Sequence, residues 1–296
     1  MAVPGPGPDG LVVVDKPAGW TSHDVVARTR KLAGTRRVGH AGTLDHMATG
    51  VLVLGIGKAT RLLGHLALTE KAYDATIRLG IGTVTDDAEG EPVSTIPAGH
   101  VEDDAIGRAI AVLTGDIDQV PSSVSAIKVN GERAYKRVRA GDTVELAARS
   151  VTVSTFDVLE TRRTADVIDL DVTIECSTGT YVRALARDLG AALGVGGHLT
   201  ALRRTRVGPY DLAAAHTLEA LEKSFEMLPI ADAVRAVFPV RDVDAEQARV
   251  IGHGGALPAT GLVGGPVAVI GPDGSFLALV EERDGFAKPL AVFVSS

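Results

Sequence analysis

The pattern of apolar and polar positions in the first part of the chain predicts a strand followed by a helix. A run rich in valine begins at Gly10 in "GLVVVDKPAGW" and stops at a proline-glycine turn. The next segment, "TSHDVVARTRKLAG", has apolar residues at helical spacing, and Thr21 or Ser22 can cap a helix that begins near Asp24. An acidic residue there also suits the positive end of the helix dipole. We therefore expect a strand, a turn and a capped helix.

The same two patterns continue through the middle of the chain. Strands are predicted for "GVLVLGIG", "KAYDATIRLGIG", "ARSVTVSTFDVLETRR" and "ADVIDLDVTIEC". Helices are predicted for "KATRLLGHLALT", for residues 103–114 and from near Thr180 onward. The segment "GDIDQVPSSVSAIKVNGERAYKRVRAG" is interpreted as a loop, a strand, an Asn-Gly turn and a basic helical tail.

Near residue 237 the pattern changes to short β-branched runs separated by glycine and proline, which predicts a small β-barrel-like domain. We expect an α+β protein whose central, mostly antiparallel sheet carries the active-site cleft in a catalytic domain of residues 10–236. The small β-domain would follow at 237–296. Residues 1–9 are expected to form a flexible N-terminus, and residues 118–145 a basic, turn-rich insertion that acts as a mobile binding arm.

Composition narrows these expectations. Apolar residues make up 45% and charged residues 23% of the 296 positions, as in ordinary globular proteins, while aromatic residues at 4% imply an aliphatic core. The single cysteine, Cys176, cannot form an internal disulfide, which suits a reducing compartment. Neither a secretory signal pattern nor an apolar run of bilayer length is present in the sequence. We expect a cytoplasmic protein that does not enter a membrane.

Charge is distributed unevenly. The net charge is −7, which by itself argues mildly against a nucleic-acid partner, but residues 85–104 hold seven acidic residues and no lysine or arginine. The basic residues gather in three clusters elsewhere, each of which could be a solvated face or a binding surface. These are Arg28, Arg30, Lys31, Arg36 and Arg37, then Lys128, Arg133, Lys136, Arg137 and Arg139, and finally Arg203, Arg204 and Arg206.

The sequence matches none of several common catalytic and ligand-binding motifs. A phosphate loop requires a hydroxyl residue directly after its lysine, but Lys58 is followed by Ala59 and Leu52 stands where the first glycine belongs. The histidine spacings match no zinc framework, so no metal is expected, and a G-x-S-x-G nucleophile motif does not occur. Asp45, in the glycine- and threonine-rich "GHAGTLDHMATG", is the remaining candidate. By spacing alone it could equally serve as an Asx-turn or a helix cap.

Several segments, taken in order, resemble the bacterial tRNA pseudouridine synthase B (TruB) family. The resemblance runs from Gly10 to about Tyr210 and is carried by "DKPAGWTSHDVV", "GHAGTLDHMATGVLVLGIGKATR", "EKAYDATIRLG", "GTVTDDAEG", "VPSSVSAIKVNGERAYKRVRAG", "CSTGTYVRALARDLG" and "GGHLTALRRTRVGPY". It implies isomerisation of the uridine at position 55 in the T loop of tRNA, with no cofactor. The implied partner is the T arm of tRNA, and the family also implies a monomer. The target base would have to leave its stack to be reached.

The resemblance also implies catalytic roles for three residues. Asp45, in "GTLDHMATG", would be the nucleophile that attacks either C1′ of the ribose or C6 of the uracil ring. Arg183, in "GTYVR", would pair with that carboxylate and favour its charged form. Tyr73, in "KAY", would stack on the target base and is a candidate to help remove the C5 proton. An unshifted phenol is a poor base at neutral pH, which favours the stacking role.

Further residues match substrate-binding positions of the family. His40 would pack into the rearranged T loop, while Tyr181 and Leu202 would touch the uracil. Asp87 would make a polar contact to the flipped nucleotides. The insertion carrying Lys128, Arg133, Lys136 and Arg137 resembles the family's thumb loop, which closes over the T arm. A basic arm over a stacking pocket suits RNA, which is held largely by phosphate and shape contacts.

The sequence departs from the family pattern in places. His46 and Met47 follow Asp45 where many members have a proline and an apolar residue, and Val124 stands where tyrosine is frequent. A less rigid nucleophile loop is one consequence to expect. The segment from Phe238 to Ser296 corresponds to the family's RNA-binding PUA domain but matches it weakly. Two other functions stay open from sequence: a non-catalytic tRNA chaperone, and a pseudouridine synthase that acts on another RNA.

Overall fold

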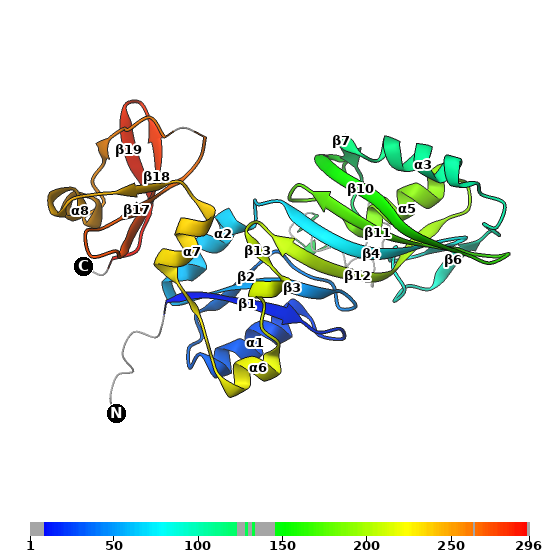
Figure 1. The fold of residues 1–296 in the computed structure, drawn as a ribbon, viewed down its shortest axis with the longest axis horizontal. Coiled ribbons are helices and arrows are strands. Elements are labelled where there is room, and N and C mark those ends of the chain that lie inside the picture. Colours follow the sequence, from blue (N-terminus) through cyan, green and yellow to red (C-terminus); the bar gives the residue numbers. More distant parts are fainter. Residues whose placement is uncertain (1–8, 123–127, 130–131, 134–145, 263, 295–296) are drawn as a thin grey trace.

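The computed structural model describes residues 9–122, 128–129, 132–133, 146–262 and 264–294. These residues form an elongated molecule (Figure 1). The C-terminal strands lie at one end, and helices α3 (Asp103–Val112) and α5 (Val182–Ala192) lie at the other.

A ten-stranded sheet runs through most of the described chain. Its strands lie in the order β14 (Leu228–Pro229), β1 (Gly10–Lys16), β3 (Thr49–Ile56), β12 (Gly197–Val207), β4 (Lys71–Leu79), β11 (Ile168–Cys176), β10 (Arg149–Arg163) and β7 (Gly115–Gln119), with β2 (Val38–Ala41) on β3 and β13 (Tyr210–Asp211) on β12.

The pairs in this sheet are antiparallel except at one place, where β12 meets β3 in a short parallel contact. There Arg204 lies beside Gly50, which has a φ of 98°. A side chain at Gly50 would place its Cβ 2.2 Å from the main-chain oxygen of Arg204. Glycine is therefore required at this position, both for its backbone conformation and for the close approach of the two strands.

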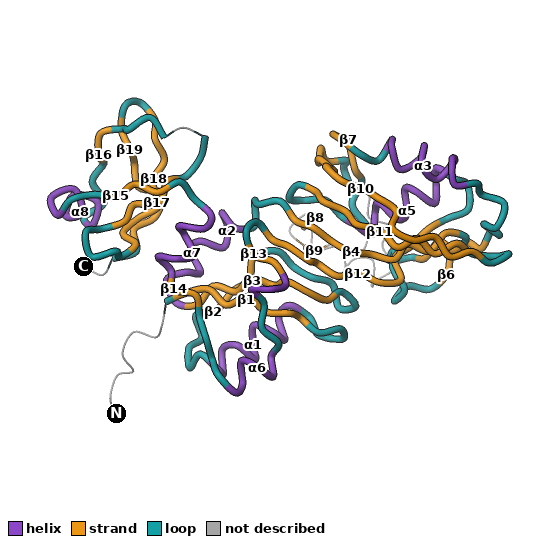
Figure 2. The backbone as a smooth tube through the Cα atoms, viewed as in Figure 1, coloured by secondary structure: helices purple, strands orange, loops and turns teal. Residues whose placement is uncertain are grey.

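Helices cover the sheet on both faces (Figure 2). Besides α3 and α5 they are α1 (Ser22–Leu32), α2 (Leu63–Leu66), α6 (Leu218–Lys223) and α7 (Ile230–Val237), with 3-10 turns at η1 (Gly57–Leu62) and η2 (Leu212–Ala214). Helix α8 (Ala245–Gly252) packs instead against the C-terminal strands. Because side chains alternate along β1, Val12 and Val14 join the main core, while Leu11 and Val13 join a second core on the opposite face. Both faces of this strand are therefore buried.

The remaining strands form three smaller sheets. They are the pair β5 (Ile81–Thr83) and β6 (Pro92–Thr95), the pair β8 (Lys128–Val129) and β9 (Glu132–Arg133), and the C-terminal sheet of β15 (Val240–Asp242), β17 (Val267–Ile270), β18 (Phe276–Arg283), β19 (Phe286–Val292) and β16 (Leu257–Pro258).

The second core joins the C-terminal sheet to the large one. Ile270 and Phe276 share this core with Leu11 and with helix α7. Arg61 of η1 adds a polar contact, because its Nη1 donates to the main-chain oxygen of Val292 at 2.7 Å. The two sheets thus share one core, and α7 packs against strands of both, β1 of the large sheet and β17 and β18 of the C-terminal one.

The expected α+β fold with a mostly antiparallel sheet is confirmed, as is the aliphatic core. Thr21 is the N-cap of α1, and it exchanges hydrogen bonds with Asp24 in a capping box, so the helix begins at Ser22. The loop expected at Gly115 was wrong, because Gly115–Gln119 forms β7 and pairs with β10. This edge strand forms because it pairs with β10. Its sequence has few apolar residues, so no alternating pattern predicts a strand there.

Parts of two predictions lie outside the described residues. They are most of the flexible N-terminus, at residues 1–8, and the Asn-Gly turn with the helical tail of the basic insertion, at residues 130–131 and 134–145. On either side of that turn the backbones of Lys128 and Arg133 pair as β8 and β9. The boundary near residue 237 stays a prediction. The helices in the described ranges include none long and apolar enough to cross a membrane.

Candidate active site

Asp45 lies on the loop between β2 and β3, and hydrogen bonds to helix α1 fix this loop. The Ser22 hydroxyl accepts from the Leu44 amide at 2.9 Å and donates to the Leu44 carbonyl at 3.1 Å. The Leu44 side chain is buried in the main core. Asp45 itself keeps 39% of its side chain exposed. The Asp45 carboxylate is thus held at the surface of the core by its buried neighbour.

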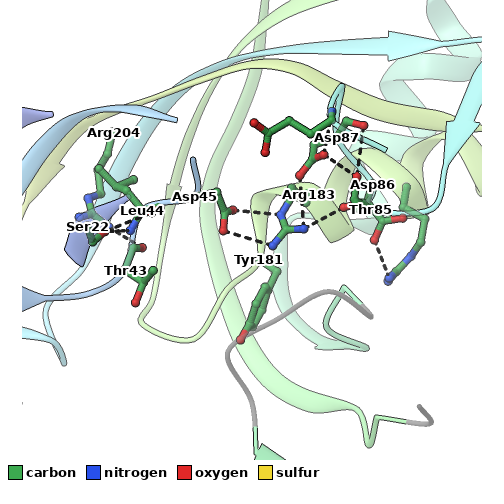
Figure 3. Close-up of polar contacts among 12 residues, drawn as sticks. Ser22, Thr43, Leu44, Asp45, Thr85, Asp86, Asp87, Tyr181, Arg183 and Arg204 are labelled. Atoms are coloured by element: carbon green, nitrogen blue, oxygen red, sulfur yellow. Dashed lines mark hydrogen bonds and ion pairs between the residues drawn. The ribbon is translucent and has the colours of Figure 1, made fainter. Parts of the chain in front are cut away.

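Arg183, in the first turn of α5, grips the Asp45 carboxylate with two nitrogens (Figure 3). Its Nε lies 3.0 Å from Oδ2 and its Nη2 lies 3.3 Å from Oδ1. The guanidinium side chain is only 6% exposed. Two parallel contacts of this kind fix the plane of the carboxylate as well as its position.

The other side of the Arg183 guanidinium faces the acidic loop between β5 and β6. Nη1 donates to the main-chain oxygen of Thr85 at 2.8 Å and lies 3.4 Å from Oδ2 of Asp87. The turn that presents both groups uses a left-handed backbone at Asp86, with a φ of 60°. Burial raises the pKa of the Asp86 carboxyl, and Arg187 lies 3.3 Å from it.

Asp87 therefore sits behind Arg183. Its side chain is 4% exposed, and its Oδ1 accepts from the Thr85 hydroxyl and from the Glu89 amide. The acidic loop is a folded part of the site that supports the arginine. A contact between Asp87 and flipped nucleotides stays a prediction.

A cavity of about 270 Å³ opens beside Asp45. Its lining includes Asp45, Lys71, Tyr73, Tyr181, Leu202 and Arg204. Strands β4 and β12 bring Tyr73 and Leu202 to one wall, because these strands pair directly. Tyr181 comes from the residue before α5.

Tyr73 forms a buried wall of this cavity, with 7% of the residue exposed. Burial raises the pKa of its phenol, and the nearby Arg204 guanidinium opposes this shift. The hydroxyl therefore keeps its proton at neutral pH. Such a side chain presents an aromatic face and a neutral hydroxyl to a ligand.

Arg204 supports the loop of Asp45 through hydrogen bonds to its main chain. The residue is 1% exposed, and its Nε donates to the Val51 carbonyl at 2.7 Å. Its terminal nitrogens donate to the carbonyls of Gly42 at 3.1 Å and Thr43 at 3.5 Å. The sequence showed Arg204 as one member of a basic cluster, but its main-chain partners lie more than 150 positions away. Nothing in the local pattern distinguished it.

The arginines of the third basic cluster have partners within the chain itself. Arg203 forms a two-point pair with Asp15, at 3.0 and 2.8 Å, and Arg206 lies 3.1 Å from Glu175. These contacts on β1, β11 and β12, with those of Arg204, give all three basic residues of the cluster partners within the chain.

Gln119, which the sequence did not single out, fixes the backbone of Tyr181. The Tyr181 amide donates to Oε1 of Gln119 at 2.8 Å, and Nε2 of Gln119 donates back to the Tyr181 carbonyl at 3.1 Å. Gln119 is 2% exposed. The end of strand β7, next to the basic insertion, is thereby joined to the wall of the cavity.

Lys71 is a second residue that sequence reasoning missed. It lines the cavity but is only 7% exposed, and its Nζ donates to the carbonyls of Ala67 at 3.0 Å and Thr69 at 2.7 Å. Burial lowers the pKa of Lys71 to about 8, and the neighbouring Arg204 adds to this shift. Its place at the start of a strand, before an alternating run, resembled an ordinary solvated lysine.

His40 lies on β2 and faces His23 of α1 edge-on, with ring centroids 5.7 Å apart. Burial lowers its pKa, and the charges of His23 and Arg204 add to the effect. It is half-buried and is not among the residues that line the cavity. Lys136 and Arg137 lie outside the described residues, and for Lys128 and Arg133 the backbone alone is described.

The arrangement defines a class of enzyme that attacks its substrate with a carboxylate. A surface carboxylate, aimed by a buried arginine into a cavity with an aromatic wall, can bind a planar ligand and attack it covalently. In the described ranges, no group of three His, Cys, Asp or Glu side chains is placed to hold a metal ion.

Comparison with known proteins identifies the family. The "TruB family pseudouridylate synthase (N terminal domain)" matches residues 30–182. The "tRNA pseudouridylate synthase B C-terminal domain" matches residues 183–237, and "tRNA Pseudouridine synthase II, C terminal" matches residues 238–294. The chain belongs to the TruB family of pseudouridylate synthases, which are isomerases.

Relatives cover nearly the whole chain. It is 60% identical over 292 residues to tRNA pseudouridine synthase B of Thermobifida fusca, covering 97% of this chain and 99% of the relative. It is 61% identical over 284 residues to the protein of the same name from Nocardia farcinica, covering 96% of this chain and 92% of that relative. Among solved structures, a chain from an H/ACA RNP bound to a substrate RNA containing 2′-deoxyuridine is similar, with a TM-score of 0.71 and 25% identity over 100% of this chain and 92% of the other.

Proposed function

We propose that this protein isomerises the uridine at position 55 in the T loop of tRNA to pseudouridine, with Asp45 as the nucleophile. The observation that carries this proposal is the two-point Asp45–Arg183 pair at the edge of a cavity walled by Tyr73. Membership of the TruB family, and relatives named tRNA pseudouridine synthase B, support tRNA as the substrate.

The reaction needs one nucleophile and no cofactor. In one route, a carboxylate oxygen of Asp45 bonds to C1′, the C1′–N1 bond breaks, and its electron pair leaves with the uracil. The uracil then turns, C5 bonds to C1′, and the ester bond to Asp45 breaks and restores the carboxylate. C5 finally loses its proton and N1 gains one. In the other route Asp45 first adds to C6, and the net bond changes are the same.

The residues around Asp45 suit these steps. Arg183 holds the carboxylate in one plane, and Asp87 and Thr85 hold Arg183, so Asp87 acts through the arginine. Tyr73 keeps its proton because burial raises its pKa, which favours stacking on the base over proton abstraction. Leu202 and Tyr181 complete the walls that hold the turning uracil.

We further propose that the T arm is the part of tRNA that this protein binds. His40 would contact the T loop, and the insertion with Lys128, Arg133, Lys136 and Arg137 would contact its phosphates. We also propose that the protein acts as a monomer in the cytoplasm and needs no metal.

The test is to map pseudouridine in an unmodified tRNA transcript after incubation with the protein. Conversion at the T-loop uridine is expected with the wild type and with Asp157→Asn, a control at an exposed position of β10. Asp45→Asn should bind the transcript equally well and convert none of it. Turnover by a clean Asp45→Asn preparation would reject Asp45 as the nucleophile. Tight binding without conversion by the wild type would favour a tRNA chaperone, and conversion of a different RNA alone would reject the T loop.

The basic insertion offers a test of the RNA path. Neutralising Arg133, Lys136 and Arg137 together should weaken tRNA binding and reduce the slope of log affinity against log salt by about two to three, since each phosphate contact contributes about 0.7 to 0.9. Filter binding between low and moderate salt measures this slope. An unchanged slope would place the RNA elsewhere on the protein.

A further inference from the structure

The residue after Asp45 makes a contact that the proposed reaction does not use. Nδ1 of His46 lies 2.6 Å from Oε1 of Glu89. Because a carboxylate can only accept, Nδ1 carries the proton in this contact. Both side chains are about half exposed, at 52% and 45%. The pair joins the loop of Asp45 to the acidic loop between β5 and β6.

This contact closes a ring around the nucleophile. The Glu89 amide donates to Oδ1 of Asp87 at 3.1 Å, and Oδ2 of Asp87 lies 3.4 Å from Nη1 of Arg183. Arg183 in turn grips Asp45, which is bonded through the chain to His46. The carboxylate and the arginine that aims it are therefore connected twice, directly and through the His46–Glu89 pair.

The main chain of His46 is fixed from the opposite side. Its carbonyl accepts from the Gly19 amide at 3.1 Å and from Nζ of the buried Lys16 at 3.3 Å. The charged groups around the imidazole are Glu89, the Asp45 carboxylate next in the chain, Lys16 of β1 and Asp24 of α1, whose pKa the His46 charge helps to lower. Three of these four groups are carboxylates, which attract a charged imidazole.

We propose that His46 and Glu89 form a positioning pair for the nucleophile, and that protonation of His46 strengthens it. The inference rests on the proposed role of Asp45. While the imidazole is charged, the pair holds the loop of Asp45 at a fixed distance from the loop that supports Arg183. A charged imidazole attracts the Glu89 carboxylate more strongly than a neutral one, so the contribution of the pair falls when the imidazole loses its proton.

The expected effect is small because the pair is half exposed. Exposed ion pairs contribute about 0.2 to 1 kcal/mol, which corresponds to a change in rate of up to about fivefold. The experiment measures the single-turnover rate of pseudouridine formation at saturating enzyme, for the wild type, His46→Gln, Glu89→Gln and the double variant, at pH 6 and pH 8.5.

At pH 6 each single variant should be about two- to fivefold slower than the wild type, with unchanged tRNA affinity. The double variant should be no slower than either single variant, because all three lack the same interaction. At pH 8.5 the differences should shrink, and Glu89→Gln should match the wild type, since the glutamine oxygen still accepts from a neutral imidazole. Asp103→Asn, which breaks the Asp103–Arg163 surface pair between α3 and β10, is the matched control and should leave both rates unchanged.

The outcomes separate this inference from the proposed function. Unchanged rates at pH 6, additive losses in the double variant, or losses of equal size at both pH values would overturn the positioning pair while Asp45→Asn remained inactive. Failure of the wild type to convert the transcript, or turnover by Asp45→Asn, would instead overturn the proposed function.

Discussion

Two buried arginines stand on either side of the cavity, and their partners differ in kind. Arg183 of α5 contacts the carboxylates of Asp45 and Asp87, whereas Arg204 of β12 donates to three main-chain carbonyls. A pair of opposite charges can aim one reactive group. Hydrogen bonds to carbonyls fix the path of the main chain. One side of the cavity thus orients the Asp45 carboxylate, and the other side holds the loop that carries it.

Of the two arginine changes, Arg183→Met is expected to have the larger effect on activity. Removing one partner of a buried ion pair costs about 3 to 5 kcal/mol. If the transition state loses a similar free energy, single-turnover rates should fall about 10³-fold. Stability should also fall, because Asp87 is left buried without its cation. Adding Asp87→Asn should restore much of the unfolding free energy in urea but not the rate. Recovery of both together would show that Arg183 serves stability alone.

A different result is expected from Arg204→Met. This change leaves the buried carbonyl of Val51 and the partly buried carbonyls of Gly42 and Thr43 without this donor. A buried acceptor without its donor costs about 1 to 3 kcal/mol, so the unfolding free energy should fall by about 3 kcal/mol. The rate of the remaining folded protein should fall less than in Arg183→Met. Urea denaturation and single-turnover kinetics on the same preparation measure both quantities. If stability stayed unchanged and the rate fell about 10³-fold, the two sides would not differ in role.

Lys71, beside Arg204, makes stability depend on pH. Its pKa is about 8 in the folded protein, against about 10.4 in an unfolded chain. Below pH 8 Lys71 is protonated in both the folded and the unfolded protein, and burying its charge destabilises the folded protein in full. Between about pH 8 and 10 the unfolded state binds more protons, so this residue makes the unfolding free energy rise, by up to about 3 kcal/mol.

Lys71→Met should remove this part of the rise, as measured by urea denaturation at pH 8 and 9.5. Raised pKa values of Tyr73 and Cys176 act in the opposite direction at higher pH, so the difference between wild type and variant is the quantity that isolates Lys71. Parallel curves for the two proteins would contradict the lowered pKa.

Of the changes to the cavity walls, Tyr73→Phe is expected to have the smallest effect, because it keeps the aromatic wall and removes only the hydroxyl near Arg204. If Tyr73 stacks on the base, the rate should fall less than about tenfold, whereas Tyr73→Ala should reduce it further because the stacking surface is lost. Single-turnover rates of the two variants measure the difference. Equal, large losses in both would assign the chemistry to the hydroxyl.

Local patterns in the sequence predicted the elements that depend on local physics. The valine run of β1, the Thr21 cap and the alternating strand at Tyr73 could all be predicted from propensity and spacing. Asp45 and Arg183 required the family resemblance, because they lie 138 positions apart and meet only through the fold. Their assigned roles stay predictions.

Other parts of the site could not be predicted because their meaning depends on distant partners. Arg204 looked like its neighbours in a basic cluster, although the fold directs it inward to carbonyls of another strand. The acidic stretch was notable in the sequence for its charge, yet Asp87 within it is buried against Arg183. His46 was expected to loosen the loop, and its contact with Glu89 depends on the packing of two loops that are 43 positions apart.

The second core has a consequence for how the protein is made. Leu11 on the first strand is buried together with Ile270 and Phe293 near the end of the chain. A ribosome synthesises from the N-terminus at about 5 to 20 residues per second, so the core that begins with β1 stays incomplete until the last segment emerges. A prematurely ended chain would therefore expose the part of this core that the C-terminal strands cover, an apolar surface suited to chaperone binding.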